Sequence, residues 1–324
     1  MSPSPRPARR ALPRIERVSD LALIAGHLPP RSVIIPGGDR TEDLRLVESA
    51  RDHGIVDRCI LVGDGPSIER AAEEVGIPLA AEDVVHATSH EEAAAATVEY
   101  VRNGQAEVIL KGNISTPVLN RAILQLRVRP TISLVTMFDA APIAGGRPLL
   151  LTDPGVTVSC DYERMVGLVT NAIDVAHDIM GITRPRVAIL SANEKIIASL
   201  PSTQMGQDLS ARHWPGAAVY GPLSFDLAVS PDSVALKEGA LSDVAAEVAG
   251  QADILVCPGI DAANVLYKVI MEIVKYGLGT TAGVTVGVAV PYVILSRADN
   301  VETKLQSIAM CSLAAERMTM AKDG

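Results

Sequence analysis

Aromatic side chains are scarce in this chain of 324 residues, which has one Trp, two Phe and six Tyr. Aromatic rings supply the stacking platforms for single-stranded nucleic acids and the anchors of many protein interfaces, so neither kind of surface is expected. An excess of positive charge is also lacking, because 29 Lys and Arg stand against 38 Asp and Glu, a net charge of −9. Nucleic-acid affinity depends on clustered Lys and Arg, so this balance argues against a nucleic-acid partner.

Closely spaced cysteines are missing as well. The four cysteines show no C-x-x-C spacing, and the N-terminal segment has no apolar stretch of the secretory type. They are Cys59, Cys160, Cys257 and Cys311. We therefore expect reduced thiols, a cytoplasmic location, no disulfide and no zinc site. Residues 1–18 contain many Pro and Arg residues and are expected to form a flexible arm. The alternative is a basic tail that binds lipid or nucleic acid.

The sequence contains none of the common nucleotide-binding, zinc-binding or nucleophile motifs. G-x-x-x-x-G-K-[ST], H-E-x-x-H and G-x-S-x-G do not occur, so the commonest cofactor enzymes are disfavoured and no metal is expected. Residues 276–296 carry no charge and are long enough to cross a membrane, but Gly, Thr and Pro291 interrupt the run. We expect a glycine-rich loop leading into a buried strand there, and no membrane partner.

Short apolar runs rich in β-branched residues alternate with amphipathic segments of helix length, which predicts βαβ units and an α/β fold. Continuous apolar runs are typical of parallel strands covered on both faces. The predicted strands are 32–36, 59–62, 108–110, 132–137, 149–152, 187–191, 254–257 and 288–295. We predict two domains that face each other across a cleft. The first comprises residues 19–150 and 294–324, and the second comprises residues 151–293.

The segment L-K-G-N-I-S-T-P at residues 110–117 joins the end of a predicted strand to the start of a predicted helix. Its glycine permits a tight turn, its hydroxyl side chains can cap the helix, and its proline suits the first helical turn. Free helix-terminal N–H groups beside a lysine predict an anion site at the end of a strand. The candidate residues are Lys111, Gly112, Asn113, Ser115 and Thr116. The alternative is an ordinary helix start beside a solvated lysine.

The segment 257–268 also opens where a predicted strand ends. Asn264 and Lys268 are four residues apart and therefore share one face of a helix, from which an amide and a cation can face the cleft. The alternative is a helix whose Asp261 offsets the macrodipole and whose lysine lies on the surface.

A third segment, 293–304, places Ser296 and Arg297 where a buried strand meets a helix. An arginine held by rigid backbone suits bidentate recognition of phosphate. Asp299 either caps the following helix, a role that Asn300 can also fill, or presents a carboxylate to the cleft.

Taken in this order, the three segments resemble the phosphate acetyltransferase/butyryltransferase family, and the resemblance is nearer to the butyryl branch. V-G-D at 62–64, L-L-L-T-D-P-G-V-T-V-S-C-D at 149–161 and S-R-A-D at 296–299 contribute to it. The resemblance implies a two-domain fold like that of the isocitrate/isopropylmalate dehydrogenases and a homodimer or higher homo-oligomer. It also implies the reaction acyl-CoA + phosphate = acyl phosphate + CoA with a short-chain acyl group, in which CoA and inorganic phosphate are substrates and no cofactor takes part.

The resemblance also assigns the phosphate-binding groups. Arg297, the helix-terminal N–H groups near Ser115 and Thr116, and Lys111 would hold the phosphate dianion. Placing two reactants and stabilising charge would then account for most of the catalysis.

The remaining roles concern the thioester and the proton. Ser296 and Asn264 would orient the carbonyl or the leaving sulfur, and Lys268 would neutralise the charge that develops. Thr303 stands where the acetyl branch has a basic aspartate, so the general base is open. Asp299 is one candidate, and the other possibility is that the phosphate dianion needs no strong base.

Two other functions fit parts of the sequence. A non-catalytic regulatory protein that binds acyl-CoA would suit the loss of the acetyl branch's aspartate. A metal- and NAD(P)-dependent decarboxylating dehydrogenase of the same general fold is the second alternative, although the sequence shows no aspartate cluster and no adenine-binding pattern for it.

Overall fold

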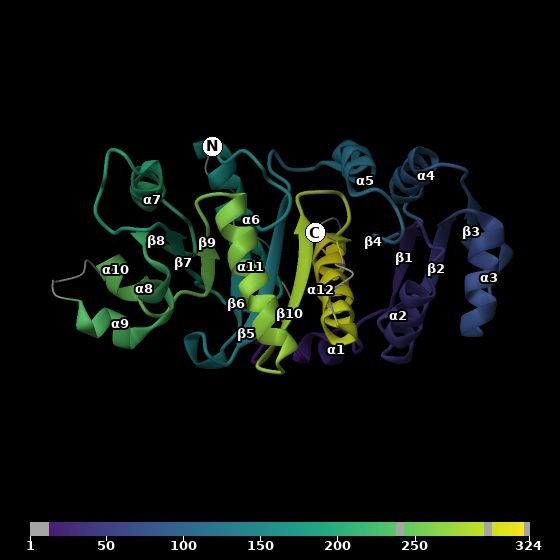
Figure 1. Ribbon diagram of the computed structural model, residues 1–324, viewed down its shortest axis with the longest axis horizontal. Coiled ribbons are helices and arrows are strands. Elements are labelled where there is room, and N and C mark those ends of the chain that lie inside the picture. The colour runs from purple at the N-terminus through teal and green to yellow at the C-terminus, as the bar shows by residue number, and fades with distance from the viewer. Residues whose placement is uncertain (1–12, 238–242, 295–299, 321–324) are drawn as a thin grey trace.

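The computed structural model describes residues 13–237, 243–294 and 300–320. Their strands form one mixed sheet in the order β3-β2-β1-β4-β11-β10-β5-β6-β9-β7-β8 (Figure 1). The strands are β1 Arg31–Pro36, β2 Val56–Gly63, β3 Val84–His86, β4 Val108–Leu110, β5 Ser133–Ala140, β6 Leu149–Thr152, β7 Arg186–Leu190, β8 Ala218–Leu223, β9 Ile254–Val256, β10 Gly279–Val286 and β11 Tyr292–Val293.

Helices cover both faces of this sheet, so the predicted α/β class is confirmed. The helices are α1 Asp20–Ala25, α2 Thr41–Asp52, α3 Gly65–Val75, α4 His90–Arg102, α5 Thr116–Ile123, α6 Tyr162–Asp178, α7 Pro201–Ala211, α8 Phe225–Val229, α9 Pro231–Leu236, α10 Asp243–Val248, α11 Ile260–Lys275 and α12 Val301–Met320. Short 3-10 turns are η1 Ala81–Asp83, η2 Leu124–Leu126 and η3 Ala144–Gly146.

The sheet contains two halves, each built from mutually parallel strands. Strands β3, β2, β1, β4 and β11 are parallel to one another, and so are β6, β9, β7 and β8. Between them, β10 and β5 are antiparallel to both of their neighbours, so the two halves run in opposite senses. Within the described residues, β10 and β11 share one register pair, Thr285 and Tyr292, whereas β10 pairs with β5 along its whole length.

The expectation for residues 276–295 was wrong in part. The expected glycine-rich loop contains a strand, β10, and the expected strand at 288–295 is reduced to the two residues of β11. Gly279 is tolerated in β10 because the backbone of β5 lies very close, so that an added Cβ would lie 2.1 Å from the Asp139 carbonyl oxygen. Before β11, the chain leaves the sheet, since the Ala289 N–H donates to the carbonyl of Leu126 instead.

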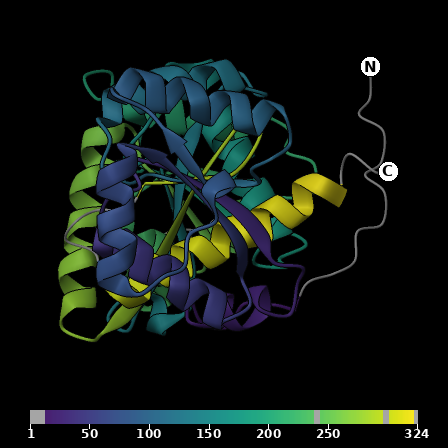
Figure 2. The ribbon, with the colours of Figure 1, turned by 90° about the vertical axis from the view of Figure 1, so that its right-hand side faces the viewer.

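The core differs between the two faces of the sheet. On one face a single apolar cluster runs along both halves and includes side chains of α1, α2, α6 and α12. On the other face, α4 and α5 cover the first half, and α8, α10 and α11 cover the second half with a separate cluster. Figure 2 shows this layering, with α4 above the strands and α1 and α12 below them. The proposed domain boundary near residue 150 stays a prediction.

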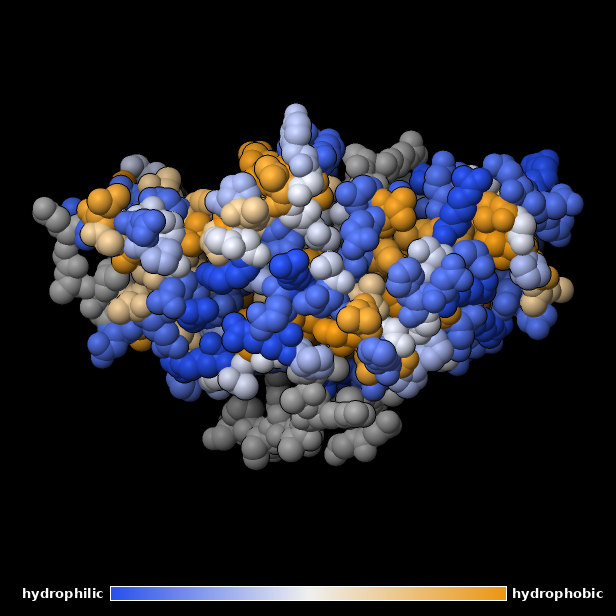
Figure 3. Space-filling view, turned by 90° about the horizontal axis from the view of Figure 1, so that it is seen from below, coloured by the Kyte–Doolittle hydropathy of each residue, from blue (hydrophilic) through white to orange (hydrophobic). Residues whose placement is uncertain are grey.

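The surface seen from below is mainly hydrophilic, with interrupted apolar patches (Figure 3). Among the described residues, no helix combines the length and the apolar character needed to cross a membrane.

Candidate active site

The predicted anion site begins where β4 ends, on a loop that is pressed against the loop after β1. The Gly112 N–H donates to the Pro36 carbonyl at 3.2 Å, and the Asn113 N–H donates to the Gly37 carbonyl at 2.7 Å. A Cβ at Gly112 would lie 2.3 Å from the Gly37 carbonyl oxygen, so this contact requires a glycine. The two loops therefore fix the course of the chain into α5.

The N-terminus of α5 presents the groups that the sequence suggested. Ser115 stands at the N-cap position, but its side chain forms no capping hydrogen bond. Its N–H donates to Nδ1 of His90 at 3.4 Å. Lys111 lies at the same loop, with Nζ donating to the Gly112 carbonyl at 3.1 Å. Amides, hydroxyls and an ammonium group thus meet at one helix end, which suits an anion.

The side chain of Asn113 contacts the loop between β1 and α2 rather than α5. Its Nδ2 donates to Asp39 at 3.3 Å, and its Oδ1 accepts from Arg40 at 3.3 Å. Asn113 therefore joins the loop after β4 to the loop after β1, and Ser115 and Thr116 stand at the N-terminus of α5.

Helix α11 carries the second predicted pair. Asn264 Nδ2 donates to the Pro154 carbonyl at 2.8 Å, which ties α11 to the loop after β6. Lys268 is exposed, and its Nζ lies 5.2 Å from the centre of the Tyr267 ring. The two residues share one helix as predicted, but neither lines the cavity described below.

Ser296, Arg297 and Asp299 lie outside the described residues. The chain is described again from Asn300, whose Oδ1 accepts the Thr303 N–H at 2.7 Å and so caps α12. The capping bond expected from Asp299 or Asn300 therefore comes from Asn300.

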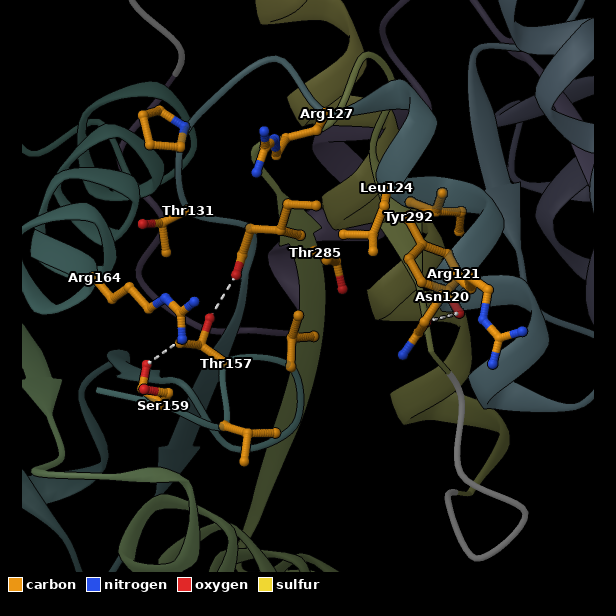
Figure 4. Close-up of a pocket in the computed structure, with 15 residues that line it drawn as sticks. Asn120, Arg121, Leu124, Arg127, Thr131, Thr157, Ser159, Arg164, Thr285 and Tyr292 are labelled. Carbon is orange, nitrogen blue, oxygen red and sulfur yellow. Dashed lines mark hydrogen bonds between the residues drawn. The ribbon is translucent and has the colours of Figure 1, made fainter. Parts of the chain in front are cut away.

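A cavity of about 530 Å³ lies where the two halves of the sheet meet. One wall comes from the end of α5, Leu124 of η2 and Arg127, and the opposite wall comes from residues 130–132, residues 156–159 and the start of α6. Thr285 of β10 and Tyr292 of β11 complete the lining (Figure 4).

Three arginines give this cavity a positive charge. Arg121 and Arg127 come from the first wall, and Arg164 lies across the cavity from Arg121 (Figure 4). Arg164 donates to the Ser159 carbonyl at 3.3 Å and lies 3.7 Å from a carboxylate oxygen of Asp161, outside the lining. Among the residues that the structure describes, no acidic side chain lines the cavity, so the site favours phosphate groups.

The rest of the lining is largely apolar. Ile123 and Ile132 contribute to it, together with Leu124 and Val158, which are 57% and 77% exposed. Tyr292 is fully buried, its hydroxyl donates to Asn120 at 3.3 Å, and burial raises the pKa of its phenol. The cavity can thus hold a ligand that has both a hydrocarbon part and phosphate groups.

Sequence reasoning missed these arginines. Arg121 lies in α5, whose N-terminus was the predicted anion site, but no motif marked it. Arg164 lies just beyond the T-D-P-G-V-T-V-S-C-D segment and comes near α5 only in the folded chain.

Within the described ranges, no group of three or more His, Cys, Asp or Glu side chains is placed to hold a metal ion. Burial raises the pKa of Cys59 and Cys257 to about 12, so these thiols stay protonated near neutral pH. The absence of a metal and of a cofactor stays a prediction.

Comparison with known proteins gives a consistent result. The family model described as "Phosphate acetyl/butaryl transferase" matches residues 81–312. Phosphate butyryltransferase from Clostridium acetobutylicum is 35% identical over 280 residues, which is 84% of this chain and 89% of that protein. Probable phosphate butyryltransferase from Bacillus subtilis is 32% identical over 94% of this chain and 99% of that protein.

Among solved structures, a branched-chain phosphotransacylase from Enterococcus faecalis V583 superimposes with a TM-score of 0.72 at 31% identity. The match covers 88% of this chain and 99% of the other. The chain therefore belongs to the phosphate acetyl/butyryltransferase family.

Proposed function

We propose that this protein transfers a short-chain acyl group between CoA and inorganic phosphate, in the manner of a phosphate butyryltransferase. The observation that carries the proposal is the cavity between the two halves of the sheet, whose lining combines three arginines with apolar side chains. An acyl-CoA has this composition, because its phosphates are anionic and its acyl chain is apolar. The family to which the chain belongs supports the same reaction.

The geometry of the described residues supports the following division of the site. The CoA thioester lies in the cavity, with its phosphates toward Arg121, Arg127 and Arg164. Inorganic phosphate binds at the loop after β4, where Lys111 and the N-terminus of α5 supply donors, and Arg297 is its main anchor. Ser296, Asn264 and Lys268 keep the roles that the resemblance implies for them, with Asn264 and Lys268 reaching the thioester from α11, outside the cavity lining.

The chemistry requires placement and charge stabilisation. A phosphate oxygen attacks the thioester carbonyl, the C–S bond breaks, and the proton of the phosphate is transferred to the departing thiolate. Asp299 is proposed to accept this proton first. Donors held in advance by the backbone stabilise the charge in the transition state without reorganising.

The proposal is tested by thiol release from butyryl-CoA with and without phosphate. We expect release that depends strictly on phosphate, together with formation of butyryl phosphate, and faster turnover of butyryl-CoA than of acetyl-CoA. Release without phosphate would indicate a thioesterase. Binding of CoA without turnover of any acyl-CoA would support the regulatory alternative, and metal-dependent reduction of NAD(P) would support the dehydrogenase.

We also propose the isocitrate/isopropylmalate dehydrogenase-like division into two domains and a cytoplasmic location. The opposite senses of the two half-sheets and the separate cores on one face support the division.

A homodimer is proposed on the outer face of α11. Val265 and Val269 are 66% and 52% exposed and four residues apart, so they form an apolar stripe on one face of the helix. Asp261 stands near the start of α11 and Lys275 at its end. An antiparallel copy of the helix would place these opposite charges together on both sides of the stripe.

Replacing Val265 with Glu is expected to convert the dimer into a monomer, because the two-fold axis would bring two new carboxylates into an apolar contact. Size-exclusion chromatography with light scattering measures the change. Leu236→Glu on α9 is the matched control, since that side chain is 86% exposed outside the stripe. A V265E protein that remains dimeric would place the interface elsewhere, and a monomeric wild type would refute the dimer.

A further inference from the structure

Asp153 is a buried acid for which the reaction above has no role. It directly follows β6 and is 2% exposed. A carboxylate in such a place is costly unless hydrogen bonds replace the lost water. Its partners therefore indicate what it does.

The carboxylate accepts hydrogen bonds from three successive backbone amides. Oδ1 accepts the N–H groups of Gly155 and Val156 at 2.9 Å and 3.0 Å, and Oδ2 accepts the Thr157 N–H at 2.8 Å. Burial raises the pKa of Asp153, whereas the amide hydrogen bonds act in the opposite direction and favour the charged form. One side chain thus determines the fold of residues 154–157.

The loop held in this way connects the cavity to helix α11. Val156 and Thr157 line the cavity (Figure 4), and the Thr157 hydroxyl donates to the Ile132 carbonyl at 2.7 Å on the same wall. At the other end of the loop, the Pro154 carbonyl accepts from Asn264 of α11 at 2.8 Å. A displacement of the loop would therefore move a cavity wall and release Asn264 together.

We propose that Asp153 is a positioning residue that shapes the acyl-CoA cavity by folding residues 154–157 around its carboxylate. The inference rests on the proposed function for the identity of the ligand, but the fold of the loop can be tested without it. Asp153 acts through the loop and through Asn264 rather than on the reacting atoms.

The test is Asp153→Asn, which is nearly the same size but replaces one acceptor oxygen with an NH₂ donor. Whichever way the new amide is turned, at least one of the three backbone N–H groups then faces a donor and loses its partner. We expect faster hydrogen exchange at residues 155–157. We also expect KM for butyryl-CoA to rise ~10-fold while KM for phosphate stays within about twofold, since only the thioester pocket has changed shape.

Two further variants keep the inference falsifiable. Thr157→Val removes the hydrogen bond to Ile132 at almost constant size and should raise KM for butyryl-CoA in the same direction, even if D153N folds poorly. Asp253→Asn is the matched control, because Asp253 is 3% exposed but pairs with Arg186 and Arg147 outside the cavity. It should lower the melting temperature and leave KM for butyryl-CoA unchanged.

The outcomes separate the two proposals. Exchange at residues 155–157 that is equally slow in wild type and D153N would overturn the positioning role. So would an active D153N enzyme with an unchanged KM for butyryl-CoA. A wild-type protein without phosphate-dependent thiol release would instead refute the proposed function, and the exchange measurement would still decide whether Asp153 folds the loop.

Discussion

An Arg297→Ala protein is expected to lose at least ~10²-fold in kcat/KM for phosphate and butyryl-CoA, the scale of removing one transition-state donor. A guanidinium can offer two parallel N–H groups to phosphate oxygens, a geometry that a lysine ammonium does not reproduce. Steady-state kinetics measure the loss, and the melting temperature shows whether the fold is intact.

Arg45→Ala provides the control for Arg297. Arg45 lies on α2, is 61% exposed, and has a loose ion pair with Glu74 at 3.9 Å, so its removal should change neither rate nor stability appreciably. Near-normal kinetics in R297A would remove Arg297 from the site and with it the proposed anchor of the phosphate.

Gly112→Ala is expected to lower kcat/KM by about 10²-fold and to destabilise the protein by about 1–3 kcal/mol. The added Cβ would lie 2.3 Å from the Gly37 carbonyl oxygen and 2.9 Å from Ile35 Cγ2, so a loop must move. That movement would displace Lys111 and the N-terminus of α5, which are the proposed phosphate ligands.

The matched control for Gly112 is Gly65→Ala at the start of α3. Gly65 also follows a strand of the first half-sheet, but an added Cβ would lie 3.6 Å from the nearest atom, which is ordinary contact. We expect normal kinetics in G65A. Normal kinetics in G112A as well would show that the loop after β4 tolerates displacement and does not hold phosphate.

Much of the fold could be predicted because its signals are local. Apolar β-branched runs alternate with helical segments, and this pattern alone gives the α/β class. Strand β10 could not be found in this way, because Gly279 and Gly283 resemble loop residues. A glycine is needed at position 279 because β5 approaches the backbone there too closely for a side chain, and this contact exists only in the folded protein. Strands β3 and β8 were also missed, one being three residues long and the other containing Gly221 and Pro222.

The site residues differ in the same way in how far the sequence predicts them. The loop from Lys111 to Thr116 could be predicted, because a strand end, a glycine and a helix start follow one another in the sequence. Arg121, Arg127 and Arg164 could not, because they gain meaning only when α5 and the start of α6 face the same cavity. The role of Asp153 depends on three amides that turn toward it only in the folded loop.

The single register pair that β10 and β11 share among the described residues has a mechanical consequence. Any rocking of one half-sheet against the other would strain this one pair of backbone partners far less than the long ladder between β10 and β5. The two partners, Thr285 and Tyr292, also line the cavity. The place where the two half-sheets join therefore forms part of the cavity lining, and a ligand bound there would contact residues of both strands at the join.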